Sequence, residues 1–420
     1  MTKTTGKTFL SPIIMMCVLF FTFGFVTWLN GTLIPFLKLA CQLTSDVQAF
    51  FVTFAFYTAY FFLALPSSYI LQATGYKKGM ALGLLIMALG SLIFIPAAYT
   101  RQFPLFLIGL FSQGMGLALI QTAVNPYVSI LGPVESAAKR ISIMGICNKI
   151  AGALSPLVLG AVLLNNAGSI EKNIEQTTDP IQKGLLLNEL SQKIIPPYIV
   201  LAVVLLILAV IIYFSSLPEI KAEEETNPDG TETHKTSIFQ FPHLLLGVLC
   251  IFVYVGVEVM AGDAIGSYGK AMGLPLESTR FFTTYTLVSM LAGYVIGIFT
   301  IPKYISQQAA LKYAAFIGIL FALLAFVTTG YTAIVFISLL GLANAIMWPA
   351  IFPLAIYKLG KFTQQGAALL IMGIVGGALV PLLYGTLKDS FHLANQLAFV
   401  VCVLPCYLFI WYYAVKGHKI

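Results

Sequence analysis

Three charged residues lie deep within apolar stretches of this chain: Lys149, Glu258 and Asp263. Every other Lys, Arg, Asp and Glu can be placed in a loop, at a terminus or at the edge of an apolar segment. A charge at the centre of a bilayer costs at least about 2.5 kcal/mol even on the mildest scales. A protein that keeps two acids and one base there is expected to use them to carry or relay an ion.

The formal charges of these three residues sum to −1. One carboxylate can pair with Lys149, and we expect Glu258 to meet it across a cavity. The other carboxylate, here Asp263, would lack a partner, and such a group takes up a proton or binds a cation. That behaviour is what ion-coupled transport requires. The alternative is a static ion pair that holds two parts of the fold together.

Carboxamides near these charges could recognise a polyol. Gln121 and Asn125 are four residues apart, so both amides point from one face of a helix. Pro126 follows them and cannot donate to the preceding turn, which leaves a backbone acceptor free. Sugar hydroxyls both donate and accept hydrogen bonds, as carboxamides do. The alternative is that the amides only hold neighbouring helices together.

Other residues that could bind a sugar are spread over four further apolar segments. An indole can stack on the apolar face of a pyranose. Packing or anchoring at the membrane interface is the alternative for the aromatic residues. Since residues four apart share a helix face, we expect Asn344 and Trp348 to line one cavity wall together. The remaining candidates for the sugar site are Asn30, Asn148 and Tyr254.

The elements that must position these residues are membrane-spanning helices. Charged residues make up 9% of the chain, hydrophobic residues 59%, and the mean hydropathy is +0.92. Soluble domains carry about 25% charged residues. Twelve apolar runs of about 20 residues fill nearly the whole chain, which predicts an all-α membrane protein with twelve spans.

Composition and motifs also exclude several functions. The chain has no HExxH or GxSxG motif, and its four histidines are scattered, so we expect no enzyme. The six cysteines form no CxxC pair, and we expect no metal site. Basic residues favour the side of the membrane that holds the termini, which predicts that both termini are cytoplasmic. This bias explains the net charge of +7 without a nucleic-acid partner.

An internal repeat divides the chain into two similar halves. The phrase Gly-Ala-Leu-Ser-Pro at 152–156 matches Gly-Ala-Leu-Val-Pro at 377–381, and each follows Ile-Met-Gly-Ile. Corresponding helices point the same way, which is the six-plus-six plan of the major facilitator superfamily, with a site at midplane between the halves. We expect six-helix bundles at 1–216 and 241–420, a cytoplasmic linker at 217–240, and an external segment of unassigned role at 166–195.

Several phrases resemble one family within this superfamily, the fucose and glucose/galactose permeases. They are Gln-Thr-Ala-Val-Asn-Pro-Tyr-Val at 121–128, Gly24 with Leu29-Asn30 and Pro35, and Tyr-Val-Gly-Val-Glu-Val at 254–259. The resemblance covers essentially all twelve spans. It implies import of a monosaccharide (fucose, glucose, galactose or an N-acetylhexosamine) together with a proton or a sodium ion.

Two departures from the fucose permeases are informative. Those proteins carry an acid after the first-span Asn, where this chain has Gly31, and an acid in the fourth span, where it has Gln121. The glutamine resembles the glucose/galactose branch. Because both acids of the N-terminal half are missing, we assign the coupling role to Glu258 and Asp263. In the alignment of the two repeats Gly31 falls opposite Asp263. We interpret this as one acidic position that lies in the N-terminal half of the fucose permeases and in the C-terminal half of this chain.

The sequence therefore predicts a monomeric sugar:cation symporter of the bacterial inner membrane, with a hexose and the lipid bilayer as partners. Its only cofactor would be the co-transported H⁺ or Na⁺. Lys149 would act as the switching partner of the two acids. The alternatives are import of fucose or an N-acetylhexosamine, proton-linked export of another small solute, or a membrane sensor or receptor.

Overall fold

The computed structural model describes residues 7–130, 137–165, 167–215, 217, 237–301, 303–359 and 362–420. Within these ranges all regular structure is helical, and twelve segments are long and apolar enough to cross a membrane. The fold class predicted from the sequence is confirmed. Most of the predicted linker, residues 218–236, lies outside the described ranges.

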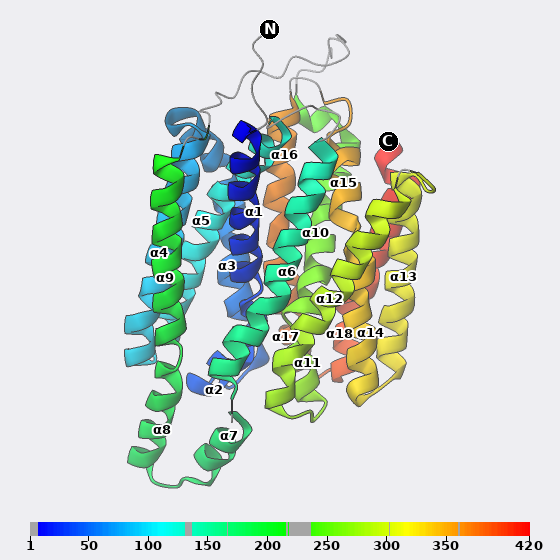
Figure 1. The fold of residues 1–420 in the computed structure, drawn as a ribbon. Coiled ribbons are helices and arrows are strands. Elements are labelled where there is room, and N and C mark those ends of the chain that lie inside the picture. The colour runs from blue at the N-terminus through cyan, green and yellow to red at the C-terminus, as the bar shows by residue number, and fades with distance from the viewer. Residues whose placement is uncertain are drawn as a thin grey trace.

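The N-terminal half contains six spans and a pair of shorter helices between the fifth and the sixth (Figure 1). The bounds of its helices are α1 Lys7–Thr27, α2 Asn30–Ala40, α3 Asp46–Thr74, α4 Tyr76–Thr100, α5 Phe103–Ile130, α6 Ala137–Leu163, α7 Ala167–Gln176, α8 Pro180–Gln192 and α9 Ile195–Phe214.

The C-terminal half repeats the six spans after a short 3₁₀ turn at Ile238–Gln240. The bounds of its helices are α10 Pro242–Gly262, α11 Ile265–Ala271, α12 Leu276–Thr300, α13 Gln307–Val327, α14 Gly330–Asn344, α15 Met347–Ile356, α16 Thr363–Met372, α17 Gly376–Asp389 and α18 Asn395–Val415.

Three spans are interrupted in their interior by a two-residue turn, and the eleventh by a 3₁₀ turn at Gly373–Val375 between α16 and α17. The first breaks at 28–29 between α1 and α2, the seventh at 263–264 between α10 and α11, and the tenth at 345–346 between α14 and α15. A break frees backbone carbonyls, which must find donors inside a membrane. Ser155 Oγ donates to Phe25 O at 2.6 Å beside the first break. Beside the second, threonines of α12 donate to the last carbonyls of α10.

Glycines let equivalent helix pairs approach closely in the two halves. A Cβ at Gly24 of α1 would lie 1.9 Å from the carbonyl oxygen of Asn148 in α6. A Cβ at Gly376 of α17 would lie 1.8 Å from the carbonyl oxygen of Phe252 in α10. The first and fifth spans therefore cross as the seventh and eleventh do, because each pair has a glycine at its contact.

The two halves meet along α3 with α17 and along α6 with α12. The start of α1 and the C-terminal end of the chain lie at one end of the bundle, which we name the termini face (Figure 1). The α7–α8 pair projects from the opposite end, which we name the hairpin face.

The halves are tied together at the hairpin face. Asp46 at the start of α3 forms ion pairs with Lys38 of its own half and Lys388 of the other. The backbone N–H of Val47 donates to Asp389 Oδ2 at 2.7 Å. Similarly, α7 is held by an ion pair between Glu171 and Lys270 and by a 2.6 Å bond from the Gly168 amide to Glu277 Oε1. These contacts hold the two halves together at the hairpin face.

Candidate functional site

The predicted contact between Lys149 and Glu258 is present. Lys149 Nζ of α6 lies 3.0 Å from Glu258 Oε1 of α10, so the ion pair joins the two halves. The two side chains are only 9% and 12% exposed. The ring centroid of Trp28 lies 4.8 Å from the same ammonium group, close enough for a cation–π interaction.

Tyrosines surround the Glu258 carboxylate. The hydroxyl of Tyr254, one turn earlier in α10, faces it. Tyr57 of α3, Tyr294 of α12 and Tyr407 of α18 lie near it, but the hydroxyls of Tyr57 and Tyr407 donate to Asp263 and Asn344. Phenolic O–H groups donate to carboxylates, so Tyr254 offers the ionised form of Glu258 a donor in addition to Lys149.

Asp263 lies at the break of the seventh span and is fully buried. Tyr57 Oη is 3.5 Å from its Oδ2, a long hydrogen bond, while its Oδ1 has no partner among the described residues. The backbone N–H of Gly31, in the first turn of α2, also faces this carboxylate. A helix N-terminus favours negative charge, so the acid of one half is stabilised by a helix of the other.

Two of the predicted amides line the N-terminal half. Gln121 of α5 is partly exposed, and its Nε2 donates to Tyr60 Oη at 3.2 Å. Asn148 of α6 is partly buried, and its Nδ2 donates to Phe20 O at 3.3 Å. Asn125 is in α5, but its side chain lies outside the part of the chain that the structure describes.

Two further amides lie at helix breaks with unused hydrogen-bonding capacity. Asn30 begins α2, is 1% exposed, and neither polar atom of its side chain has a partner within the described ranges. Asn344 ends α14; its Oδ1 accepts from Tyr407 Oη at 2.8 Å, whereas its Nδ2 has no described partner. An unsatisfied buried polar group costs about 1–3 kcal/mol, so these amides could bind a polar ligand.

The tenth span breaks at 345–346, so Asn344 and Trp348 belong to different helices. Because both residues of the break keep right-handed helical backbone angles, the expectation that the two side chains line one cavity wall stays a prediction. Trp348 is half-buried in α15, with ring centroids 6.4 Å from Tyr254 and 5.9 Å from Phe352. Tyr254 itself is buried between this indole and Glu258.

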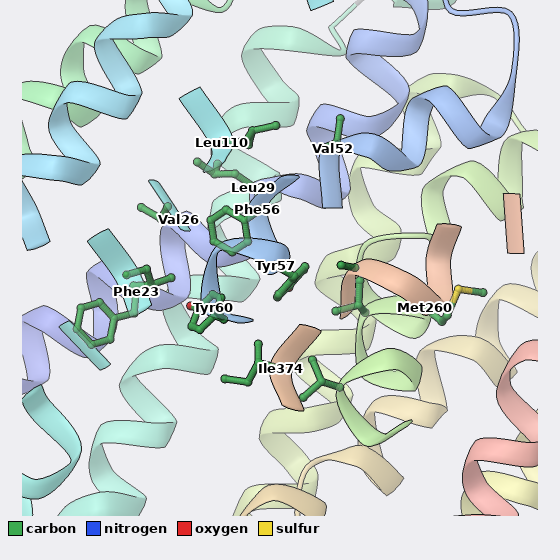
Figure 2. Packing of buried hydrophobic residues seen from close by; sticks show 14 of the residues in the cluster. Phe23, Val26, Leu29, Val52, Phe56, Tyr57, Tyr60, Leu110, Met260 and Ile374 are labelled. Carbon is green, nitrogen blue, oxygen red and sulfur yellow. The ribbon is translucent and has the colours of Figure 1, made fainter. Parts of the chain in front are cut away.

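Sequence reasoning missed two tyrosines and one tryptophan. Tyr57 and Tyr60 of α3 belong to a packed cluster that also holds Phe56, Met260 and Ile374, and so draws on both halves (Figure 2). Tyr57 contacts Asp263 and Tyr60 contacts Gln121. Their three-residue spacing within an apolar run was the available signal. The third residue, Trp28, directly precedes the Leu29-Asn30 pair of the first-span phrase, and its position alone indicated no role.

These features (twelve spans, interrupted helices and a buried ion pair between repeated halves) define a secondary-transporter architecture. The family model of the Major Facilitator Superfamily matches residues 16–383. The chain belongs to this superfamily, and within it to the fucose and glucose/galactose permeases.

Two relatives and one solved structure are similar along nearly the whole chain. A glucose/galactose transporter of Brucella abortus biovar 1 (strain 9-941) is 35% identical over 407 residues, covering 96% of this chain and 93% of the relative. The L-fucose-proton symporter of Escherichia coli (strain K12) is 27% identical over 390 residues, covering 92% and 88%. The crystal structure of the transporter FucP in the outward conformation has a TM-score of 0.73 at 24% identity, covering 98% and 99%, and shows a shared fold.

Proposed function

We propose that this protein imports a hexose of the glucose/galactose type together with a cation. The observation that carries the proposal is the buried Lys149–Glu258 ion pair, which joins the two halves. Near it lies the Asp263 carboxylate, whose Oδ1 has no hydrogen-bond partner among the described residues. The named activities of the relatives, glucose/galactose transport and fucose–proton symport, support a sugar as substrate and a coupled ion.

The sugar site in this proposal lies between the halves. Gln121, Asn125 and Asn148 supply amides from the N-terminal half, and Asn30 supplies one from the first helix break. Asn344, Trp348 and Tyr254 form the facing wall. The unpartnered amide atoms of Asn30 and Asn344 support this assignment, because sugar hydroxyls would satisfy them.

The cation site in this proposal uses Glu258 and Asp263, with Lys149 as the switching partner. A proton or sodium ion on one acid changes the balance of charge around Lys149, which then holds or releases Glu258. Position 31 supports the interpretation that an acid changed halves. A Cβ at Gly31 would lie 2.4 Å from Thr283 Oγ1, so a side chain is excluded there, and Asp263 faces that backbone from the other half.

We place the protein in the bacterial inner membrane as a monomer with both termini in the cytoplasm. The termini face is then cytoplasmic and the hairpin face external. The units 1–216 and 241–420 rock about the site, joined by the 217–240 linker. The contacts between the halves at the hairpin face support the interpretation that this structure is a state shut to the outside.

Uptake of labelled sugar into proteoliposomes tests the proposal. An inward proton or sodium gradient is imposed, and glucose, galactose, fucose and N-acetylglucosamine are compared as substrates and competitors. We expect glucose or galactose to accumulate above the external concentration with one of the two gradients. Entry without accumulation under either gradient contradicts the coupling. Absence of entry of any sugar contradicts the assignment of a sugar substrate.

A further inference from the structure

Trp28 fills the space between the two halves at the break of the first span. Its side chain is buried, with the residue only 2% exposed. On one side, a Cβ at Gly152 of α6 would lie 2.4 Å from the indole Cδ1. On the other side, a Cβ at Gly262 of α10 would lie 2.2 Å from the indole Cζ3. Opposite edges of one ring therefore press on backbone of opposite halves, at positions that leave no room for a side chain.

The same ring adjoins the machinery assigned to the cation. Its centroid is 4.8 Å from Lys149 Nζ, which is 3.0 Å from Glu258. Gly262, which the ring contacts, immediately precedes Asp263. Trp28 thus contacts the partner of one acid and the backbone that carries the other.

Trp28 also belongs to a small apolar cluster that is separate from the main core. The cluster draws on both halves and includes the first residue of the break in the tenth span; its members are Trp28, Ala153, Leu287, Met290 and Ala345, with Tyr294 packed against it. The breaks of the first, seventh and tenth spans are therefore linked through contacts of this one side chain and its cluster.

We propose that Trp28 is the positioning residue that couples the charge state of the Lys149–Glu258 pair to movement of the helix break carrying Asp263. This role rests on the proposed cation-coupled transport. The aromatic face holds the Lys149 ammonium group, since cations are attracted to indole faces. When the cation changes the position of Lys149, the ring shifts, and its far edge moves Gly262 because no compliant side chain lies between them.

The two edges of the ring allow a test by compensation. Gly262→Ala and Gly152→Ala each add a methyl group against Trp28, and each is expected to lower sugar accumulation at least tenfold. Phenylalanine lacks the outer ring that contains Cζ3 but keeps a carbon corresponding to Cδ1. Trp28→Phe should therefore restore accumulation when combined with Gly262→Ala and should not restore it when combined with Gly152→Ala.

The accumulation ratio must be compared with the rate of sugar exchange in the same proteoliposomes. Trp28→Leu removes the aromatic face, so we expect exchange within about threefold of the native rate while gradient-driven accumulation is lost. Trp28→Phe keeps a ring beside Lys149 but loses the outer edge that contacts Gly262, so by itself it should retain exchange and lower accumulation. A merely structural role would lower exchange and accumulation in proportion. That outcome, or native accumulation in Trp28→Leu, overturns the proposal.

Fluorescence keeps the proposal testable if a variant folds poorly. The chain has three tryptophans, and the emission change on adding the coupling cation without sugar should be present in the native protein and absent in Trp28→Phe. An identical change in both proteins overturns the role of Trp28. If the native protein does not accumulate sugar, the proposed function is overturned. If the native protein accumulates sugar but the Trp28 and glycine variants do not behave as expected, only the role of Trp28 is overturned.

Discussion

Replacing Lys149 by glutamine should expose how strongly the two halves are joined at the site. At 3.0 Å and an effective dielectric constant of about 20, the attraction between Lys149 and Glu258 is about 5.5 kcal/mol. Breaking a buried ion pair by removing one partner typically costs about 3–5 kcal/mol, because the remaining charge is left uncompensated. We expect a cost near the lower value, since the hydroxyl of Tyr254 offers Glu258 another donor.

A double-mutant cycle measures this coupling. Lys149→Gln, Glu258→Gln and the double variant are compared with the native protein by thermal unfolding in detergent. Each single variant should unfold at a lower temperature, and the double variant should be more stable than Lys149→Gln, because no unpaired charge remains. Lys312→Gln, at an exposed position of α13, is the matched control and should change little.

The same variants separate stability from transport. Glu258→Gln should retain sugar exchange and lose accumulation, and the double variant should do the same despite its recovered stability. Strictly additive effects of the two single substitutions on unfolding would refute the reasoning, since they would show that the pair is not coupled. Retained accumulation in Glu258→Gln would transfer the ion-carrying role to Asp263.

Three further predictions concern neighbouring contacts. Asp263→Asn should make sugar uptake independent of the cation gradient while exchange continues; uptake that still follows the gradient would assign the ion to Glu258 alone. Tyr60→Phe removes the hydroxyl that accepts a hydrogen bond from Gln121, a loss of about 1 kcal/mol. The KM for hexose should therefore rise about fivefold while the accumulation ratio stays unchanged. An unchanged KM would show that Gln121 is not part of the sugar site. Asp46→Asn removes both ion pairs of this carboxylate, whose side chain is only 11% exposed. Breaking a buried pair costs about 3–5 kcal/mol, so labelling of a cysteine introduced between the halves near the hairpin face should become at least tenfold faster. An unchanged rate would show that these pairs do not hold the halves together at that face.

The overall architecture could be predicted from the sequence because it depends on composition. Twelve apolar runs of spanning length and a matching phrase in the fifth and eleventh spans are properties of the chain itself. The contact of Lys149 with Glu258 was also predictable. Two opposite charges at similar depth in an apolar medium have few other ways to be neutralised.

The helix breaks could not be predicted from the same patterns. Neither residue of the break at 345–346 is a proline or a glycine. The four-residue spacing of Asn344 and Trp348 gave no sign that a break lies between them. Breaks are tolerated where side chains from other helices meet the freed carbonyls, as Thr283 and Thr286 do for α10. Such tertiary partners leave no local signal.

The roles of Tyr57, Tyr60 and Trp28 were hidden for a related reason. In an apolar helix a tyrosine or tryptophan is usually packing material, and only its neighbours decide otherwise. Tyr57 is a candidate because its hydroxyl lies 3.5 Å from Oδ2 of Asp263, which is 206 residues later in the chain. Trp28 is a candidate because glycines of two different helices lie at opposite edges of its ring.

The most direct test of cation-coupled sugar transport is the steady-state accumulation ratio of labelled glucose or galactose in proteoliposomes under an imposed cation gradient. We expect a ratio well above one in the native protein. It should collapse when an ionophore dissipates the gradient, and Glu258→Gln and Asp263→Asn should show no accumulation. A ratio of one in the native protein under both proton and sodium gradients, with sugar still entering, would contradict cation-coupled transport.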